Sequence, residues 1–157
     1  MNRLELNDYK NRIELMSDWH ERLYNAQRGH YVCSEKLYNK ADLTGYALIL
    51  SSTIVTGCLF FDAQGWWKFM LVTMSILSAA LSGLVSFGRF SEKAELHRAA
   101  AGNYGKLRRQ LENLHAKKDK LDDDALDIKL KVLRIEWEYI SQNSPLTPKS
   151  ALKNRGI

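Results

Sequence analysis

Polar and apolar residues are segregated along this chain into long blocks. Two uncharged runs, Leu43–Phe61 and Phe69–Phe87, lie in the middle, and charged residues are frequent on either side of them. As a helix, each run of about 19 residues would measure about 28 Å, close to the ~30 Å hydrocarbon core of a bilayer. The pattern predicts two transmembrane helices, because core helices of soluble bundles usually keep one polar face and these runs keep none.

Residues 62–68 are the only connection between the runs, and so short a loop requires an antiparallel hairpin. Trp66 and Trp67 stand where aromatic anchors meet the membrane interface, and Arg89 follows the second run. The loop has one basic residue, Lys68, whereas the outer flanks carry Arg28, Lys36, Lys40, Arg89, Lys93, Arg98 and Lys106. The positive-inside rule therefore predicts a multi-pass membrane protein with both termini in the cytoplasm.

The N-terminal arm, residues 1–42, has the spacing of an amphipathic helix. Tyr9, Met16, Leu23, His30 and Leu37 recur every seven residues, and Trp19 lies three positions after Met16. No proline interrupts the arm, so we expect it to continue directly into the first span.

Residues 88–142 form the second arm. Its apolar positions repeat at intervals of three and four and include His97, Tyr104, Leu107 and Leu111. Asp122–Asp124 interrupts the repeat; an N-terminal helix cap explains these carboxylates better than a metal site does. A last amphipathic helix is expected to end near Ser141, and residues 143–157 form a polar tail.

The expected fold class is thus an all-α membrane protein, a two-transmembrane hairpin with long cytoplasmic helical arms. The stripes of the two arms are suited to packing on each other and on neighbouring chains. The candidate assembly residues are Tyr9, Met16, Trp19, Leu23, His30, Leu37, His97, Tyr104, Leu107 and Leu111.

Hydroxyl side chains mark one face of the second run, Ser75, Ser78, Ser82 and Ser86, and Ser52 and Thr56 lie one turn apart in the first. Small residues let helices approach closely in lipid, so this stripe either packs the hairpin or lines a narrow aqueous path in an oligomer. Neither run contains a charge, which argues against a proton-coupled transporter.

Composition adds few chemical candidates. The formal net charge is +5, but acidic residues are interleaved with the basic ones, so nucleic acid is not an expected partner. His20-Glu21 lacks the second histidine of a zinc-protease helix, because Tyr24 occupies that position. Cys33 and Cys58 are not expected to pair. We expect no enzyme activity, cofactor or metal.

The second arm opens with Phe90-Ser-Glu-Lys-Ala-Glu-Leu-His97, followed by Ala99-Ala-Ala-Gly-Asn-Tyr104-Gly-Lys-Leu107. With the two-span hairpin before it, this pattern resembles the SLATT family, two-transmembrane effector domains associated with bacterial nucleotide-signalling conflict systems. The resemblance covers roughly residues 10–140. It implies an effector that oligomerises and permeabilises the inner membrane when a partner senses infection.

The chain departs from a complete sensor and effector because it has no recognisable ligand-sensing domain. Activation would then come from a separately encoded sensor or through the arms. The expected function is an oligomeric, pore-forming membrane effector of antiphage defence, of the abortive-infection type. The alternative is a membrane-anchored coiled-coil scaffold that recruits a cytoplasmic partner.

Overall fold

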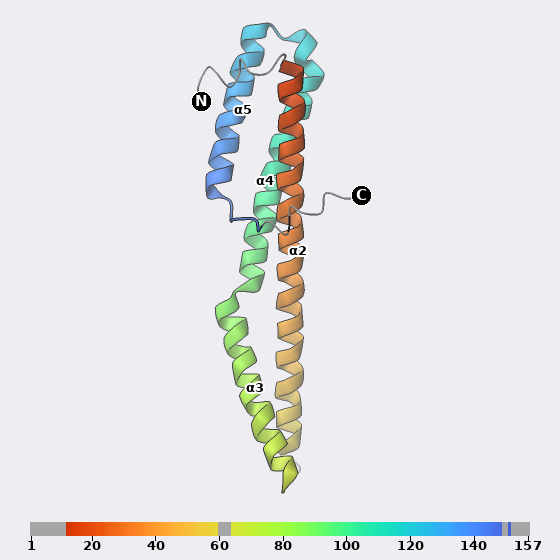
Figure 1. The fold of residues 1–157 in the computed structure, drawn as a ribbon, viewed down its shortest axis with the longest axis vertical. Coiled ribbons are helices and arrows are strands. Elements are labelled where there is room, and N and C mark those ends of the chain that lie inside the picture. Colours follow the sequence, from red (N-terminus) through yellow and green to blue (C-terminus); the bar gives the residue numbers. More distant parts are fainter. Residues whose placement is uncertain (1–11, 60–63, 149–150, 152–157) are drawn as a thin grey trace. The chain divides into compact units, whose positions relative to one another are not determined.

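A computed structural model describes residues 12–59, 64–148 and 151, and these residues contain helices and no strand. The helices are α2 (Arg12–Leu59), α3 (Trp66–Gly88), α4 (Phe90–Lys117) and α5 (Asp123–Asn143), with a short 3-10 helix, Lys118–Lys120, before α5 (Figure 1). The all-helical class predicted from the sequence is confirmed for this part of the chain, and α2 runs without interruption from the N-terminal arm into the first apolar run.

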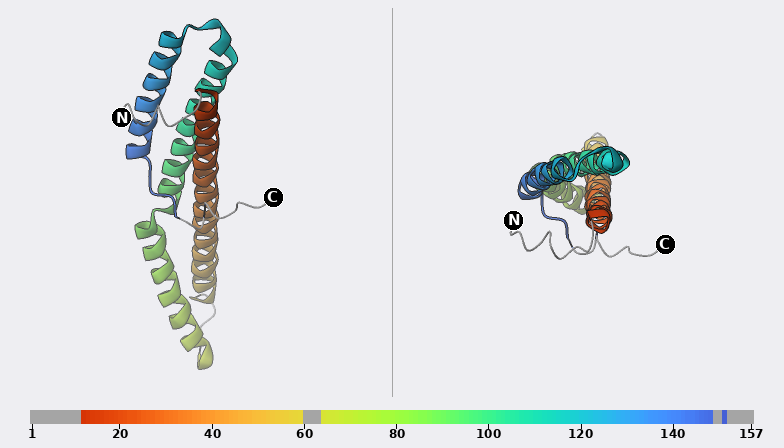
Figure 2. Two further views of the ribbon diagram at one scale, coloured as in Figure 1. Left: turned by 45° about the horizontal axis from the view of Figure 1, so that its top comes forward. Right: turned by 90° about the horizontal axis from the view of Figure 1, so that it is seen from above.

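The chain divides into two compact units. One, called here the bundle unit, consists of Met1–Cys33 and Leu96–Ile157, and the other, the apolar unit, is Ser34–Glu95. In the bundle unit the start of α2, most of α4 and the whole of α5 lie side by side (Figures 1 and 2). The apolar unit contains the rest of α2, α3 and the first turn of α4.

The bundle unit holds a continuous leucine-rich core. Its residues come from positions three and four apart on each helix, so each helix presents one apolar face to the other two. Trp19 of α2 meets Trp137 of α5 edge to face, with ring centroids 5.8 Å apart. The buried members are Leu15, Met16, Trp19, Leu23, Tyr104, Leu107, Leu111, Leu114, Leu126, Leu130, Leu133 and Ile140.

This core contains most of the residues that the sequence predicted for assembly. Met16, Trp19, Leu23, His30, His97, Tyr104, Leu107 and Leu111 are all buried within the bundle unit. Leu37 is half-buried in the apolar unit, and Tyr9 lies outside the described residues. The stripes of the arms pack on each other, as expected. Contact of the same residues with a neighbouring chain stays a prediction.

Polar contacts fix the ends of the bundle. Asp122 caps α5, as predicted: its side chain accepts hydrogen bonds from the backbone N–H groups of Asp124 and Ala125. Arg12, at the start of α2, forms a two-pronged ion pair with Asp127 at 2.8 and 3.0 Å and a further one with Asp123 at 2.7 Å. These carboxylates raise the pKa of Arg12, and they join the first described turn of the chain to α5.

The apolar unit departs from the predicted boundaries at the start of α3. The helix begins at Trp66, so Trp66, Trp67 and Lys68 belong to α3 and not to the connecting loop. Gly65 precedes it with a φ of 61°, a conformation that glycine adopts without a steric penalty. At the other end Arg89 has φ 47° and ψ 40°, and this single left-handed residue separates α3 from α4.

We predict that Leu23→Asp unfolds the bundle unit. Leu23 has no exposed surface, and an unpaired carboxylate in its place should lower the free energy of unfolding by several kcal/mol, on the order of 3 to 5. Chemical denaturation followed by circular dichroism measures the change. Leu96→Asp, the same substitution at a leucine that is 54% exposed, is the control. Equal stability of the two variants would show that the core lies elsewhere.

Candidate functional site

The apolar unit exposes a large amount of hydrophobic surface on both of its long helices. No residue of α3 is buried, and Phe87 is 87% exposed. Soluble monomers rarely expose apolar patches of more than a few hundred Å², and larger ones indicate a membrane or protein interface. The exposed residues here are Leu43, Tyr46, Ile49, Leu50, Ile54, Trp66, Trp67, Phe69, Met70, Val72, Ile76, Leu77, Leu84, Val85 and Phe87.

Among the described residues, one helical segment contains a stretch that is long and apolar enough to cross a membrane. It is Trp66–Lys117, which comprises α3 and α4, and its most apolar window has no buried residue. The finding supports membrane association on length and composition. The first predicted span ends at Phe60 and Phe61, outside the described residues, so the second crossing stays a prediction.

One pair of serines joins the two helices of the apolar unit. Ser78 of α3 donates a hydrogen bond to Ser51 of α2, with 2.8 Å between the two Oγ atoms. Ser51 is buried and Ser78 is half-buried, together with Leu71, Met74 and Leu81 on the same side of α3. The hydroxyl stripe was expected either to pack the hairpin or to line an aqueous path. For Ser78 the structure shows a packing contact.

The other predicted hydroxyl residues lie on outer surfaces. Ser75, Ser82 and Ser86 are exposed on α3, and Ser52 and Thr56 are exposed on α2. Ser75 donates to the carbonyl of Leu71 and Thr56 to that of Ser52, so these hydroxyls satisfy themselves on their own helix. The structure thus separates Ser78 from the three other serines with which the sequence grouped it.

The predicted interfacial anchors lie at the two ends of α3. Trp66 and Trp67 occupy its first turn and are strongly exposed. Arg89 follows its last residue and is paired with Glu92. An aromatic pair at one end and a cation at the other are typical of a helix whose apolar middle lies in lipid.

Two polar contacts join α2 to the first turn of α4, and the sequence analysis did not identify them. Ser34 donates to the carbonyl oxygen of Ala94 at 2.9 Å, and the Tyr38 hydroxyl bonds to the carboxylate of Glu95. Both contacts lie within the apolar unit, at the end of it that is next to the charged arms in sequence. No local spacing could have paired these residues, because they are about 60 positions apart.

Two histidines face each other inside the bundle unit. The Nδ1 atoms of His30 (α2) and His97 (α4) are 3.0 Å apart, and Tyr104 stacks on the His30 ring at a centroid distance of 5.4 Å. The Nε2 atom of His30 lies 3.4 Å from the hydroxyl of Thr147. One Nδ1 must donate and the other accept, so this contact requires that at least one of the two rings is neutral.

Burial disfavours the charged form of both rings. It lowers the pKa of His30 from 6.5 to about 4, with a further contribution from repulsion by His97. Burial also lowers the pKa of His97. The pair therefore remains neutral at neutral pH and makes a buried polar contact without introducing a charge.

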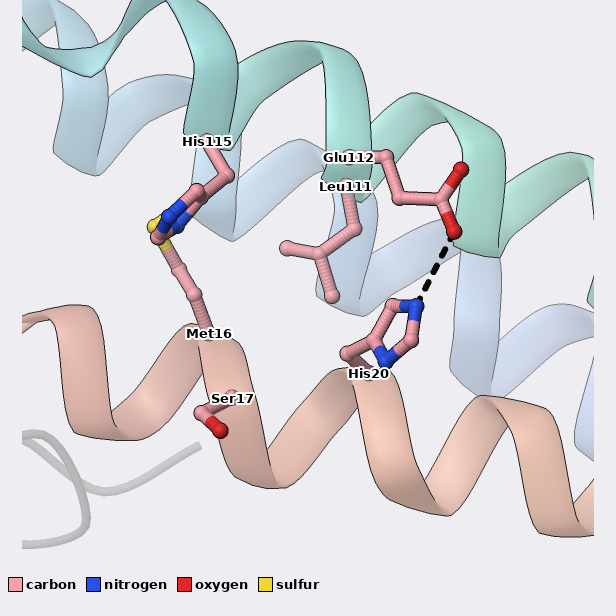
Figure 3. A pocket seen from close by; sticks show the side chains of 6 residues that line it. All are labelled: Met16, Ser17, His20, Leu111, Glu112 and His115. Carbon is pink, nitrogen blue, oxygen red and sulfur yellow. Dashed lines mark hydrogen bonds and ion pairs between the residues drawn. The ribbon is translucent and has the colours of Figure 1, made fainter.

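A surface pocket of about 320 Å³ lies between α2 and α4 in the bundle unit (Figure 3). His20 points across it toward Glu112, with 2.9 Å between Nε2 and Oε1. The other lining residues are Met16, Ser17, Leu111 and His115. Within the described part of the chain, no three His, Cys, Asp or Glu side chains are grouped as metal ligands would be. The contact therefore acts as one more polar link between two helices.

No protein family, no curated protein and no solved structure matches this chain in the comparisons. Its functional assignment therefore depends on the surfaces and contacts described above. Among these, the exposed apolar and hydroxyl surface of the apolar unit is the strongest candidate for a functional site.

We predict that the bundle unit loses stability as pH falls. In the unfolded chain His30 is protonated near pH 6.5, whereas in the folded chain it is protonated only near its lowered pKa of about 4. Below pH 6.5 the unfolded state binds more protons, so the free energy of unfolding falls by on the order of 2 kcal/mol toward pH 4. Denaturation midpoints measured between pH 7.5 and 4.5 test this.

His30→Asn is the matched variant, because its amide keeps a hydrogen-bonding group but has no proton to gain in this range. The variant should be less stable at pH 7.5 and should show a shallower pH dependence. A slope equal to that of the unchanged protein would remove His30 as its cause.

Proposed function

We propose that this protein is an oligomeric, two-span membrane effector that forms or opens a pore in the bacterial inner membrane. The observation that carries the proposal is α3, a helix of 23 residues with none of them buried and with large apolar side chains around it. In lipid such a surface needs no further cover, and a helix satisfies its own backbone hydrogen bonds.

The second span in this proposal is the part of α2 from Leu43 to its end. It is uncharged and exposes Leu43, Tyr46, Ile49 and Leu50, while its other side carries the Ser51 contact to α3. Two antiparallel spans return the chain to the side on which it started. Both arms are then cytoplasmic, in agreement with the basic flanks.

The conducting path in this proposal is lined by Ser75, Ser82 and Ser86. These exposed hydroxyls share one face of α3, since seven and four positions correspond to about two turns and one turn of helix. Ser78 is assigned instead to the contact inside the hairpin. Several copies that direct the three-serine face toward one axis would surround a narrow polar path.

The role in antiphage defence rests on the resemblance to SLATT effectors. In that role the pore is closed in uninfected cells and opens when a separately encoded sensor acts on the arms. Opening dissipates ion gradients and arrests the infected cell before the phage is released.

The topology has a direct test. In a variant without Cys33 and Cys58, a cysteine at Gln64 should react with a membrane-impermeant thiol reagent added to intact cells. A cysteine at Lys117 should react only after lysis, because it lies on the cytoplasmic side. The opposite labelling pattern would exclude the proposed orientation.

The pore assignment predicts different effects for two neighbouring serines. Ser82→Leu should make the path harder to wet and reduce ion leakage from liposomes by tenfold or more, with insertion and oligomer size unchanged. Ser78→Leu should instead disturb the contact with Ser51 and lower the stability of the oligomer. Leu84→Ile, at an exposed apolar position on the opposite side of the same helix from Ser75, is the neutral control.

Leakage and oligomer size are measured on the same preparations. If Ser82→Leu forms an intact oligomer with full leakage, the serine face does not line the path. If none of the preparations leaks, including the unchanged protein with its trigger, the effector proposal itself fails.

A further inference from the structure

The described part of the bundle unit carries an apolar stripe that faces away from its core. It lies on α5, where Ile128, Val132, Ile135 and Tyr139 are each 58% to 68% exposed. Leu126, Leu130, Leu133 and Ile140 of the same helix are buried on the opposite side. Figure 2 shows helices on one side of α5 within this unit and none on the other. The helix thus has two apolar faces, of which its own bundle covers one.

The spacing of the exposed stripe is that of a coiled-coil seam. Its four members follow one another at intervals of four, three and four, the alternation of the two core positions of a heptad. Solvent-facing helix positions do not require this order, and on α5 the stripe continues over three turns. β-Branched Ile and Val predominate in it, as they do in helix–helix seams.

The charges beside the seam are arranged to fit a second copy of the same helix. Lys129 and Lys131 flank its first half, and Glu136 and Glu138 flank its second half. In an antiparallel pair, Lys129 meets the other copy's Glu136 and Lys131 meets its Glu138. In a parallel pair, Lys131 again meets Glu136. A surface of one charge sign, such as an anionic bilayer, would be repelled by one half of this pattern.

Glu136 and Glu138 already have ion pairs within the chain, but these pairs do not prevent contacts with the lysines of a second copy. Glu136 accepts from Lys106 at 3.0 Å, and Glu138 accepts from Arg134 at 3.0 Å, one turn back on α5. Both pairs are on the surface, where ion pairs exchange partners at little cost, and a carboxylate accepts more than one hydrogen bond.

We propose that the outer face of α5 is the surface through which two copies of this chain associate, with each seam packed on the other. This inference rests on the proposed function in one respect: chains held in the same membrane meet at high effective concentration, so a seam of about three turns is sufficient. It assigns assembly to residues other than the buried stripe of α2.

Disulfide cross-linking of the full-length protein in liposomes tests the surface. In a variant without Cys33 and Cys58, Val132→Cys reports a parallel pair. A disulfide in Ile128→Cys with Tyr139→Cys, when Val132→Cys forms none, reports an antiparallel pair. Ser141→Cys is the matched control, because it is exposed on α5 but lies off the seam. A covalent dimer from either seam variant, with at least tenfold less from Ser141→Cys, supports the proposal.

A substitution gives an independent measurement. Ile135→Asp should reduce the dimer detected by an amine cross-linker at least fivefold while the circular dichroism spectrum is unchanged, since the side chain is exposed. Leu146→Asp, which adds the same charge at an exposed leucine outside α5, should leave the dimer intact.

Two negative results have different meanings. If the protein oligomerises but neither seam variant forms a disulfide and Ile135→Asp has no effect, the α5 surface is wrong and the proposed oligomeric effector stands. If the unchanged protein is monomeric in liposomes, both proposals fail. Capture of a different protein by the seam cysteines, with no dimer of this chain, would likewise overturn the second-copy assignment.

Discussion

The apolar surface of α3 is the strongest physical constraint on this chain, because its exposure to water is unfavourable. Within the apolar unit α2 covers only one side of the helix, the side that carries Ser78 and its bond to Ser51. Burial of each large apolar side chain contributes about 1.5 to 3 kcal/mol, so leaving many of them in water is very unfavourable. Contact with lipid or with other copies of the chain would cover the apolar side chains that the fold leaves exposed.

The sequence predicted the helices well and the partners of their faces less well. Spacing at three and four located the core leucines, and Asp122 was recognised as a cap because a carboxylate at that position has a local backbone partner. The seven-residue spacing of Met16, Leu23 and His30, however, is the same whether a helix packs within its chain or on another chain. Their burial against α4 and α5 shows that these residues are covered internally.

The hydroxyl residues illustrate a finer limit of sequence patterns. Ser51 and Ser52 are adjacent, and adjacent residues point about 100° apart on a helix, so their surroundings differ completely. The periodicity selected Ser52, which is exposed, whereas Ser51 is buried against Ser78. The same limit applies to His30 and His97: each lies on an apolar stripe, but that their Nδ1 atoms meet at 3.0 Å depends on the register between α2 and α4, which no local spacing records.

The ion pair between Arg12 and Asp127 also sets an order of events during synthesis. The two residues are 115 positions apart, and a ribosome that adds about 5–20 residues per second needs on the order of ten seconds to reach the second after the first. During that interval both apolar runs are synthesised, and the stripe of α2 still lacks the part of its core that α5 supplies. Both apolar runs are therefore complete before α5 can close the core of the bundle unit. Until α5 is made, the apolar surface of α3 and the uncovered part of the α2 stripe are exposed together, and both can drive aggregation.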